Sequence, residues 1–253
     1  MEVTICIPAR LKSVRFPGKV LANLAGKSVL QHVFDRVASL PNVGDVVVLC
    51  DSKVVRVAAE NFGARVIDTA EACSSGTERI VSALDRISGD FIINVQGDEV
   101  FFDATVIRKM VAKCGGSDAH IFTPIYKFDS MEDALDPSRV KVVLGHDGRA
   151  LYFSRSVIPF VRDEKNVDKW LQHTDLYGHV GIYGFRRTVL ENYHNLAPGK
   201  LESVEKLEQL RFLESGYAID TVRASQPSFG IDTPADLAKA NTLIANQLHN
   251  FNA

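Results

Sequence analysis

Five cationic side chains follow the first apolar segment, in a stretch without any acidic residue. They are Arg10, Lys12, Arg15, Lys19 and Lys27, in the sequence IPARLKSVRFPGKVLANLAGKS at residues 7–28. Arg10 can bind phosphate oxygens through two parallel hydrogen bonds, and Lys19 supplies a movable point charge. One ion pair at about 4 Å contributes about 4 kcal/mol at an effective permittivity near 20, before desolvation. Several cations in one loop therefore suit a triphosphate, although a solvated basic loop has the same composition.

Two acidic segments could meet this loop. NVQGDE (94–99) ends an apolar run with Asp98 and Glu99, and GIDTPADL (230–237) contains Asp232. Thr233, Pro234 and Asp236 have the spacing of a helix start, which leaves Asp232 without a capping role. Mg²⁺ binds one or two carboxylates together with substrate phosphates. Asp98 and Asp232 are therefore the candidate metal ligands, and an ordinary polar turn and a surface residue are the alternatives.

The segment SSGTER (74–79) begins a predicted helix. Ser75 and Glu78 fit a capping box, which explains both residues structurally. The exposed amides of a helix start, with Gly76 beside them, are also able to bind a phosphate or a base. Two other nucleotide motifs have only weak support: AGKS (25–28) lacks the first glycine of a P-loop, because position 21 is Leu21, and no GxGxxG follows the first strand.

Alternating elements position these residues. Apolar runs predict strands, and 3.6-residue periodicity predicts helices between them. We expect strands at 3–9, 45–50, 64–68 and 90–95, and helices at 28–40, 52–63, 77–87 and 104–114. This order predicts an α/β fold with a mostly parallel sheet flanked by helices, whose ligands bind at the carboxyl ends of the strands.

The pattern changes after about residue 120. Four segments are strand-like: HIFTPIYKF, VKVVLG, ALYFSRS and YGHVGIYGFRR. The spacing of the first two pairs suggests antiparallel pairing. We then expect a helix at 202–216, a strand in YAIDTVRA and a closing helix in PADLAKANTLIANQLHN. No linker or repeat divides the chain. We therefore predict one domain, 1–253, with a smaller β-rich lobe at roughly 125–190.

The bulk composition excludes several classes of protein. The net charge of −2 and pI near 6.4 argue against a nucleic-acid binder. No run approaches the length of a membrane span, and the amino terminus does not have the pattern of a signal peptide. The four cysteines form no CxxC pair. We interpret them as reduced thiols of a cytoplasmic protein.

Several motifs in order carry a resemblance to a known family. They are IPAR with RFPGK, SGTER, NVQGDE, ALYFSR, GHVGIYGFR, LEQLR and GIDTP. Nearly the whole chain resembles the 3-deoxy-manno-octulosonate (Kdo) cytidylyltransferases, also called CMP-Kdo synthetases. The resemblance implies a nucleotidyltransferase fold, a homodimer formed through the β-rich lobe, and CMP transfer from CTP to Kdo with Mg²⁺, for lipopolysaccharide synthesis.

The resemblance also implies roles for individual residues. Catalysis would involve Arg10, Lys19 and Asp98, with Asp98 the candidate base, and Mg²⁺ would be held by Asp98 and Asp232. The nucleotide would contact Arg10, Arg15, Lys19, Ser75, Gly76 and Gln96. The sugar acid would contact Arg155, His179, Tyr183, Glu208 and Gln209. Read alone, His179 would more often be a histidine satisfied within a strand, and Arg155 a structural cation.

Two departures from the family pattern bear on the substrate. Val100 stands where the family usually has proline, which changes only loop stiffness. Ser203 stands where histidine is common, and Glu202, Glu205 and Glu208 follow one another on a predicted helix face. An acidic site would favour an ammonium group, so an 8-amino-Kdo is an alternative substrate, and a solvated helix face explains the same residues. A CMP-sialate-type synthetase and a non-catalytic nucleotide sensor are further alternatives.

Overall fold

The computed structural model describes residues 1–41 and 43–251. Contacts divide the chain into two compact units, Met1–Ala104 with Ser228–Ala253, and Thr105–Pro227. No helix among the described residues is long and apolar enough to cross a membrane. The single-domain assignment remains a prediction.

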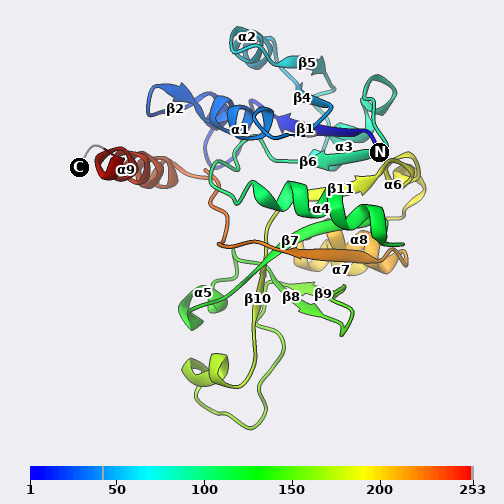
Figure 1. The fold of residues 1–253 in the computed structure, drawn as a ribbon, viewed down its shortest axis with the longest axis vertical. Helices are drawn as coiled ribbons and strands as arrows, with labels where there is room; N and C mark the ends of the chain where they lie inside the picture. The colour runs from blue at the N-terminus through cyan, green and yellow to red at the C-terminus, as the bar shows by residue number, and fades with distance from the viewer. Residues whose placement is uncertain (42, 252–253) are drawn as a thin grey trace. The chain divides into compact units, whose positions relative to one another are not determined.

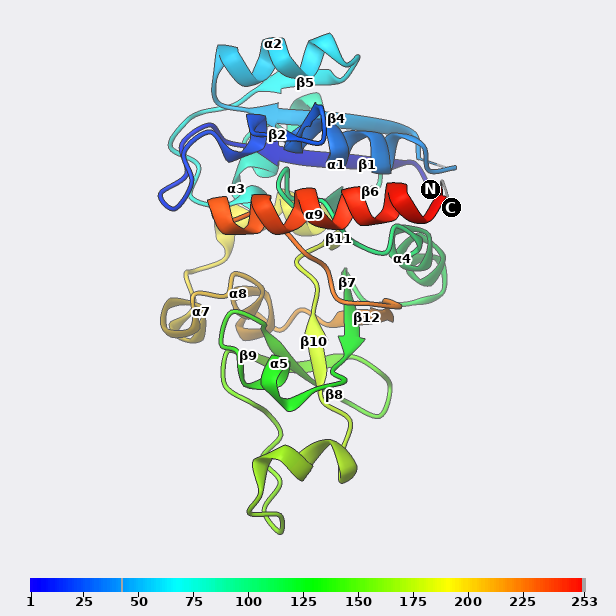
Figure 2. The ribbon, with the colours of Figure 1, turned by 90° about the vertical axis from the view of Figure 1, so that its left-hand side faces the viewer.

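The first unit is built on a parallel sheet with strand order β5-β4-β1-β6 (Figure 1). Its strands are β1 (Val3–Ala9), β4 (Asp45–Cys50), β5 (Arg65–Asp68) and β6 (Phe91–Asn94). Every residue of β1 and β6 is buried, as expected of strands that are covered on both faces. The four strands appear in this order from the top of Figure 2 downward.

Helices α1 (Val29–Ala38), α2 (Lys53–Asn61) and α3 (Gly76–Val81) pack on this sheet. The unit also contains α9 (Pro234–Phe251) and 3-10 turns at Lys19–Leu21 (η1) and Leu84–Arg86 (η2). Helix α1 packs on β1 and β4, and α3 packs on β1 and β6. A short hairpin, β2 (Asn23–Leu24) with β3 (Lys27–Ser28), precedes α1. The predicted mostly parallel, helix-flanked α/β fold is confirmed here.

Serine caps explain where several helices begin. The hydroxyl oxygens of Ser28, Ser52 and Ser75 accept the amides of Gln31, Val55 and Glu78 at the starts of α1, α2 and α3. Such caps satisfy amides that have no partner within the helix. The prediction of one helix over 77–87 is wrong in its extent. Helix α3 ends at Val81, and the chain continues through Ser82 and the separate turn η2.

The second unit is a mixed sheet centred on β7 (Ile121–Lys127). Strand β7 pairs antiparallel with β10 (Tyr177–His179) and β11 (Tyr183–Arg186), and parallel with β12 (Ile219–Arg223). Strand β8 (Lys141–Leu144) pairs antiparallel with β10 and β9 (Ala150–Ser154). The expected antiparallel pairing is therefore present, with β12 as a parallel addition. The other elements are α4 (Thr105–Gly116), α5 (Met131–Leu135), α6 (Arg187–Glu191), α7 (Lys200–Glu205), α8 (Gln209–Glu214) and 3-10 turns η3 (Val167–Gln172) and η4 (Tyr193–Asn195).

The predicted helix over 202–216 is two helices. Helix α7 ends at Glu205, because Lys206 adopts a left-handed conformation with φ 55°. That conformation redirects the chain and buries Leu207 before α8 begins. Periodicity did not reveal the break, since a lysine in the left-handed region has no sequence signature comparable to that of glycine.

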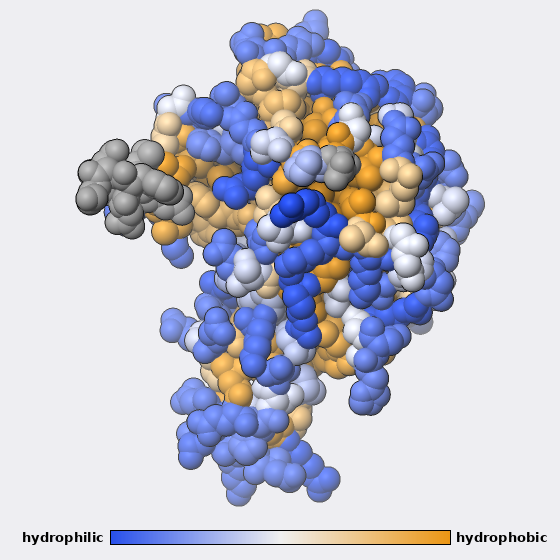
Figure 3. Space-filling view, viewed as in Figure 1, coloured by the Kyte–Doolittle hydropathy of each residue, from blue (hydrophilic) through white to orange (hydrophobic). Residues whose placement is uncertain are grey.

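A polar segment joins β9 to β10. Its 3-10 turn η3 buries Trp170, whose ring lies edge-on to Phe160 with centroids 5.0 Å apart. The surface of this segment, at the lower end of Figure 3, is mostly hydrophilic. Phe160 itself is 73% exposed, so Trp170 is the member of the pair that is anchored in the unit.

Candidate functional site

A lysine and two carboxylates form the centre of the candidate site in the first unit. The Lys19 ammonium contacts Oδ2 of Asp98, and it lies 2.7 Å from Oδ1 of Asp232. Arg15 joins them, with its Nη2 3.0 Å from Oδ2 of Asp232. Residues from three distant parts of the sequence therefore converge on one ammonium group. The strand-end argument predicted that the basic loop would meet Asp98, and Asp232 was predicted separately as the acidic residue left free by the helix start.

Local structure explains each position. Gly18 has φ 73°, a left-handed conformation that favours glycine, and it directs Lys19 into the turn η1. Asp98 lies in the turn that follows β6. Asp232 precedes α9, where the Thr233 hydroxyl accepts the amide of Asp236 and the Asp236 carboxylate accepts the amide of Thr233. This capping box is the predicted one, and it leaves the Asp232 carboxylate available to the cations.

Burial decides how strongly these charges interact. The Lys19 side chain is only 7% exposed, whereas the side chains of Asp98 and Asp232 are 24% and 47% exposed. Burial opposes the charge of Lys19, but the two carboxylates outweigh it and raise the pKa of the ammonium. Burial likewise opposes ionisation of Asp232, but Lys19 and Arg15 lower the pKa of that carboxyl. Lys19 and Asp232 therefore both carry their charges at neutral pH.

Glu99 is a further carboxyl next to Asp98. Burial raises its pKa to about 7, with smaller contributions from the charges of Asp98 and Asp232, while a hydrogen bond from Ser228 acts in the opposite direction. Glu99 was visible in the motif NVQGDE, but the sequence gave no sign that its carboxyl group is buried with a raised pKa.

A cavity of about 120 Å³ adjoins this centre. Its walls include the predicted residues Arg10, Lys19, Ser75, Gly76, Gln96 and Asp98. Gly76 is needed for close approach, because a Cβ there would lie 2.5 Å from Nε2 of Gln96. The Gln96 amide donates to Asn94, whose amide in turn donates to Thr77. The helix start of SSGTER and the turn of NVQGDE therefore form one wall.

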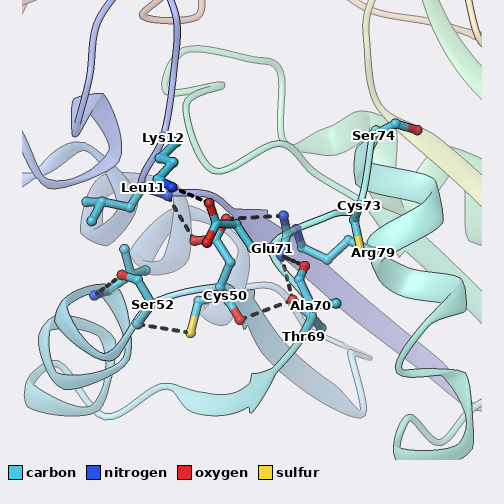
Figure 4. A network of polar contacts seen from close by, with 12 residues as sticks. Leu11, Lys12, Cys50, Ser52, Thr69, Ala70, Glu71, Cys73, Ser74 and Arg79 are labelled. Atoms are coloured by element: carbon cyan, nitrogen blue, oxygen red, sulfur yellow. Dashed lines mark hydrogen bonds and ion pairs between the residues drawn. The ribbon is translucent and has the colours of Figure 1, made fainter.

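The cavity also has lining residues that were not predicted, among them Cys73, Ser74 and Arg79. Arg79 is the centre of the network in Figure 4. Its guanidinium donates to Oγ1 of Thr69 at 2.6 Å, to the carbonyl of Ala70 at 3.1 Å and to Oδ2 of Asp51 at 3.3 Å. The side chains of Arg79 and Asp51 are 3% and 5% exposed, so this is a buried ion pair.

The same network reaches the basic loop. Oδ1 of Asp51 accepts the amide of Leu11 at 3.1 Å, and Lys12 forms an exposed ion pair with Glu71 (Figure 4). Asp51 follows β4 directly, as Asp98 follows β6. The rule that places ligands at strand ends could have identified Asp51, but the sequence gave it no recognisable motif.

In the second unit, the structure connects some of the predicted sugar-contacting residues. The Tyr183 hydroxyl donates to Oε1 of Gln209 at 3.0 Å, and the rings of His179 and Tyr183 lie 5.3 Å apart. Burial raises the pKa of Tyr183, and Glu208 adds to the effect. Glu208 accepts a hydrogen bond from Tyr193. Nε2 of Gln209 is buried and has no partner among the residues that the structure describes, so its hydrogens are available to a ligand.

His179 is neutral and held in one orientation. Burial lowers its pKa to about 3, and Nε2 lies 2.8 Å from the hydroxyl of Thr123. That hydroxyl directs its one proton to the carbonyl of Ile182 at 2.8 Å, so Nε2 must carry the hydrogen and Nδ1 is an acceptor.

Arg155 and the acidic helix face have partners inside the unit. The Arg155 guanidinium donates to the carbonyls of Pro137, Glu205 and Lys206. The Glu205 carboxylate accepts from Ser154 and from the amide of Arg155, and Glu202 binds Arg211 at 2.8 Å. Ser203 donates to the carbonyl of Gly199. These contacts give the three-glutamate pattern a structural explanation and lend no support to recognition of an ammonium group.

The side chains of the site indicate whether it could bind a metal ion. Among the described residues, no group of three or more His, Cys, Asp or Glu side chains could hold a metal ion. Asp98 and Asp232 nevertheless reach a single cation, the ammonium of Lys19. Two carboxylates fit Mg²⁺, which completes its octahedron with water and phosphate oxygens.

Solved structures share this fold. The chain superimposes on a CMP:2-keto-3-deoxy-manno-octonic acid synthetase complexed with CTP, with a TM-score of 0.90, 35% identity and coverage of 98% of this chain and 100% of the other. A putative glucose-1-phosphate thymidylyltransferase from Bacillus anthracis gives a TM-score of 0.67 at 17% identity, covering 95% and 94% of the two chains. The second likeness concerns the fold alone. The class of protein is therefore a nucleotidyltransferase.

Sequence comparisons identify the family to which the chain belongs within this class. The family model for cytidylyltransferases matches residues 4–219. The 3-deoxy-manno-octulosonate cytidylyltransferase of Porphyromonas gingivalis is 42% identical over 97% of this chain and 98% of its own. The enzyme of that name from Haemophilus influenzae is 38% identical over 97% and 99%. The chain belongs to the cytidylyltransferase family, in the group of the 3-deoxy-manno-octulosonate cytidylyltransferases.

Proposed function

We propose that this protein transfers CMP from CTP to the anomeric hydroxyl of 3-deoxy-manno-octulosonate and releases pyrophosphate. The product, CMP-Kdo, would serve lipopolysaccharide synthesis. The names of relatives near 40% identity over almost their full length support this substrate. The observation that carries the proposal is the convergence of Arg15, Lys19, Asp98 and Asp232 beside the cavity that Arg10, Ser75 and Gln96 line.

Asp98 and Asp232 are proposed to hold Mg²⁺. When bound there, the ion would supply charge neutralisation between the α-phosphate and the departing pyrophosphate. Lys19 would neutralise the same region, and Arg10 and Arg15 would bind the outer phosphates. Ser75, Gly76 and Gln96 would contact the nucleoside and its nearest phosphate.

The chemical step is a substitution at phosphorus. The anomeric oxygen of the sugar forms a bond to the α-phosphorus, and the bond from that phosphorus to the bridging oxygen breaks. Pyrophosphate leaves with the electron pair, and the hydroxyl proton passes to Asp98, the candidate base, or to solvent. Positioning and charge stabilisation provide most of the acceleration in transfers of this kind.

The second unit is proposed to supply the residues that bind the sugar acid. Gln209 has a buried amide with hydrogens to donate, and His179 offers Nδ1 as an acceptor, which suits a polyhydroxylated substrate. Tyr183 and Glu208 would add further polar contacts, and Arg155 would pair with the sugar carboxylate. We also propose that residues 1–253 act as one catalytic domain and that the cytoplasmic enzyme is a homodimer formed through the β-rich lobe.

Pyrophosphate release in the presence of CTP and Kdo, with and without Mg²⁺, tests the proposal. We expect release only when all three are present. Replacing Asp98 or Asp232 by asparagine should reduce kcat by about 100-fold or more, since each removes charge that stabilises the transition state. Asp129→Asn is a suitable control, because Asp129 lies outside this group. Binding of CTP without any release under all conditions would indicate a nucleotide sensor instead.

The same assay tests the choice of sugar. Kdo, its 8-amino analogue and a nine-carbon sialic acid should be compared by kcat/KM. The internal partners of Glu202 and Glu205 favour Kdo over the amino analogue. A higher kcat/KM for the analogue would overturn this choice of substrate while leaving the transfer of CMP intact. A higher value for the sialic acid would favour the CMP-sialate-type alternative.

A further inference from the structure

Lys19 occupies the point where the Asp98 and Asp232 carboxylates meet. We propose that Lys19 is an internal counter-cation that keeps a divalent metal out of this site until a nucleotide binds. The ammonium would hold the two carboxylates together in the free enzyme, and it would exchange them for phosphate oxygens when CTP arrives. This inference rests on the proposed function, because it assumes that the two carboxylates are the metal ligands.

The first argument is steric. The ammonium contacts Oδ2 of Asp98 and lies 2.7 Å from Oδ1 of Asp232. A Mg²⁺ ion binds carboxylate oxygens at about 2.0–2.1 Å, so an ion bridging these same two oxygens would occupy nearly the same point as Nζ. The Lys19 side chain is 7% exposed. Metal and ammonium therefore exclude each other, and the lysine has to move before a metal can bridge the pair.

The second argument is electrostatic. The two carboxylates contribute two negative charges, and Lys19 and Arg15 contribute two positive charges. Among these four side chains, which are joined by ion pairs, the net charge is zero. A dication approaching the free enzyme therefore finds no net attraction from this group, and it has to compete with the three ion pairs that the carboxylates already form.

The nucleotide changes this balance. Lys19 and Arg10 both line the cavity beside the carboxylates, so a triphosphate bound there offers Lys19 other oxygens as partners. Once the ammonium turns to the phosphates, the carboxylates lose their counter-charge and can bind a metal. Metal and nucleotide should therefore raise each other's affinity, because coupling between two binding sites is reciprocal.

Mn²⁺ binding to the free enzyme, followed by electron paramagnetic resonance, tests the proposal without any turnover. Mn²⁺ takes the same oxygen ligands as Mg²⁺. We expect weak binding to the wild type and at least about tenfold tighter binding to Lys19→Gln, which corresponds to about 1.4 kcal/mol. Lys27→Gln is the matched control, since Lys27 pairs with Asp35 away from these carboxylates, and it should behave as the wild type. Adding Asp232→Asn to Lys19→Gln should abolish the gain.

A second measurement on the wild type guards against misfolding of the Lys19 variant. The rise in Tm caused by Mn²⁺ should be larger when a non-cleavable CTP analogue is bound than without it, and this difference should vanish in Asp232→Asn. If the nucleotide-free wild type binds Mn²⁺ as tightly as Lys19→Gln, or if the variant binds more weakly, the counter-cation role is wrong while the metal site stands. If no protein binds Mn²⁺ even with the analogue, the proposed metal site fails and the inference fails with it.

Discussion

The buried pair of Arg79 and Asp51 offers a direct test of how the nucleotide site is held together. Asp51 binds two parts of the site at once, because one oxygen accepts from Arg79 and the other accepts the amide of Leu11 in the basic loop. Replacing Asp51 by asparagine keeps an acceptor for Leu11 but removes the charge that faces Arg79. We expect this change both to destabilise the fold and to loosen the loop.

The magnitude follows from burial. Removing one partner of a buried ion pair costs about 3–5 kcal/mol, because the remaining charge stays buried without compensation. Arg79 keeps its hydrogen bonds to Thr69 and Ala70, so Asp51→Asn should lie at the lower end, at about 3 kcal/mol. Asp51→Ala also loses the hydrogen bond to Leu11, which adds about 1 kcal/mol.

Urea unfolding followed by circular dichroism measures the stability, and pyrophosphate release gives the KM for CTP. Asp45→Asn is the matched control, since Asp45 lies at the other end of β4 and its pair with Arg65 is 27% and 47% exposed. Such exposed pairs contribute about 1 kcal/mol or less. The KM for CTP should rise in Asp51→Asn and not in Asp45→Asn. If the two variants lose the same stability, or if KM is unchanged in both, the reasoning about this pair is wrong.

Three further predictions concern the second unit. His179 has a pKa of about 3 when folded and about 6.5 when unfolded, so the free energy of unfolding should fall as the pH drops below 6.5. Urea unfolding measures how much of this free energy is lost between pH 7 and pH 4.5. The loss should be about 2 kcal/mol smaller in His179→Asn than in the wild type or in the control His146→Asn. Lys206→Gly should raise stability by about 0.5–1 kcal/mol in the same assay, because glycine adopts φ 55° without strain, and a loss would show that the lysine side chain contributes. Gly178→Ala should lower Tm by an amount equivalent to about 1–3 kcal/mol, because the new Cβ would overlap the Tyr126 ring, and an unchanged Tm would mean that the ring can move aside.

Much of the first unit could be predicted because its pattern and its chemistry agree. Strand β4 has the predicted bounds, and the box of Thr233 and Asp236 before α9 follows from local capping rules alone. The strand-end rule was enough to bring Asp98 to Lys19. These predictions succeeded because each depends on near neighbours in sequence or on the topology of a parallel sheet.

What could not be predicted depends on tertiary contacts. Nothing in SGTER indicates that Arg79 turns inward to Asp51, since an arginine on a short helix is usually exposed. Likewise, the break at Lys206 follows from the burial of Leu207 and from packing in the second unit. The internal pairing of Glu202 with Arg211 was also hidden, because periodicity places side chains on a helix face but does not identify their partners.

Arg15 and Lys19 both pair with Asp232, but their side chains differ in exposure, which suits them to different roles. The Arg15 side chain is 66% exposed, so its pair with Asp232 is screened by water and contributes little to holding the carboxylate. Lys19 is 7% exposed and binds both carboxylates, so the positions of Asp98 and Asp232 depend mainly on this residue. An exposed arginine can turn to a phosphate at small cost, whereas moving Lys19 requires another set of oxygens in its place. The arginine is therefore suited to capturing the nucleotide, and the lysine to linking that capture to the state of the two carboxylates.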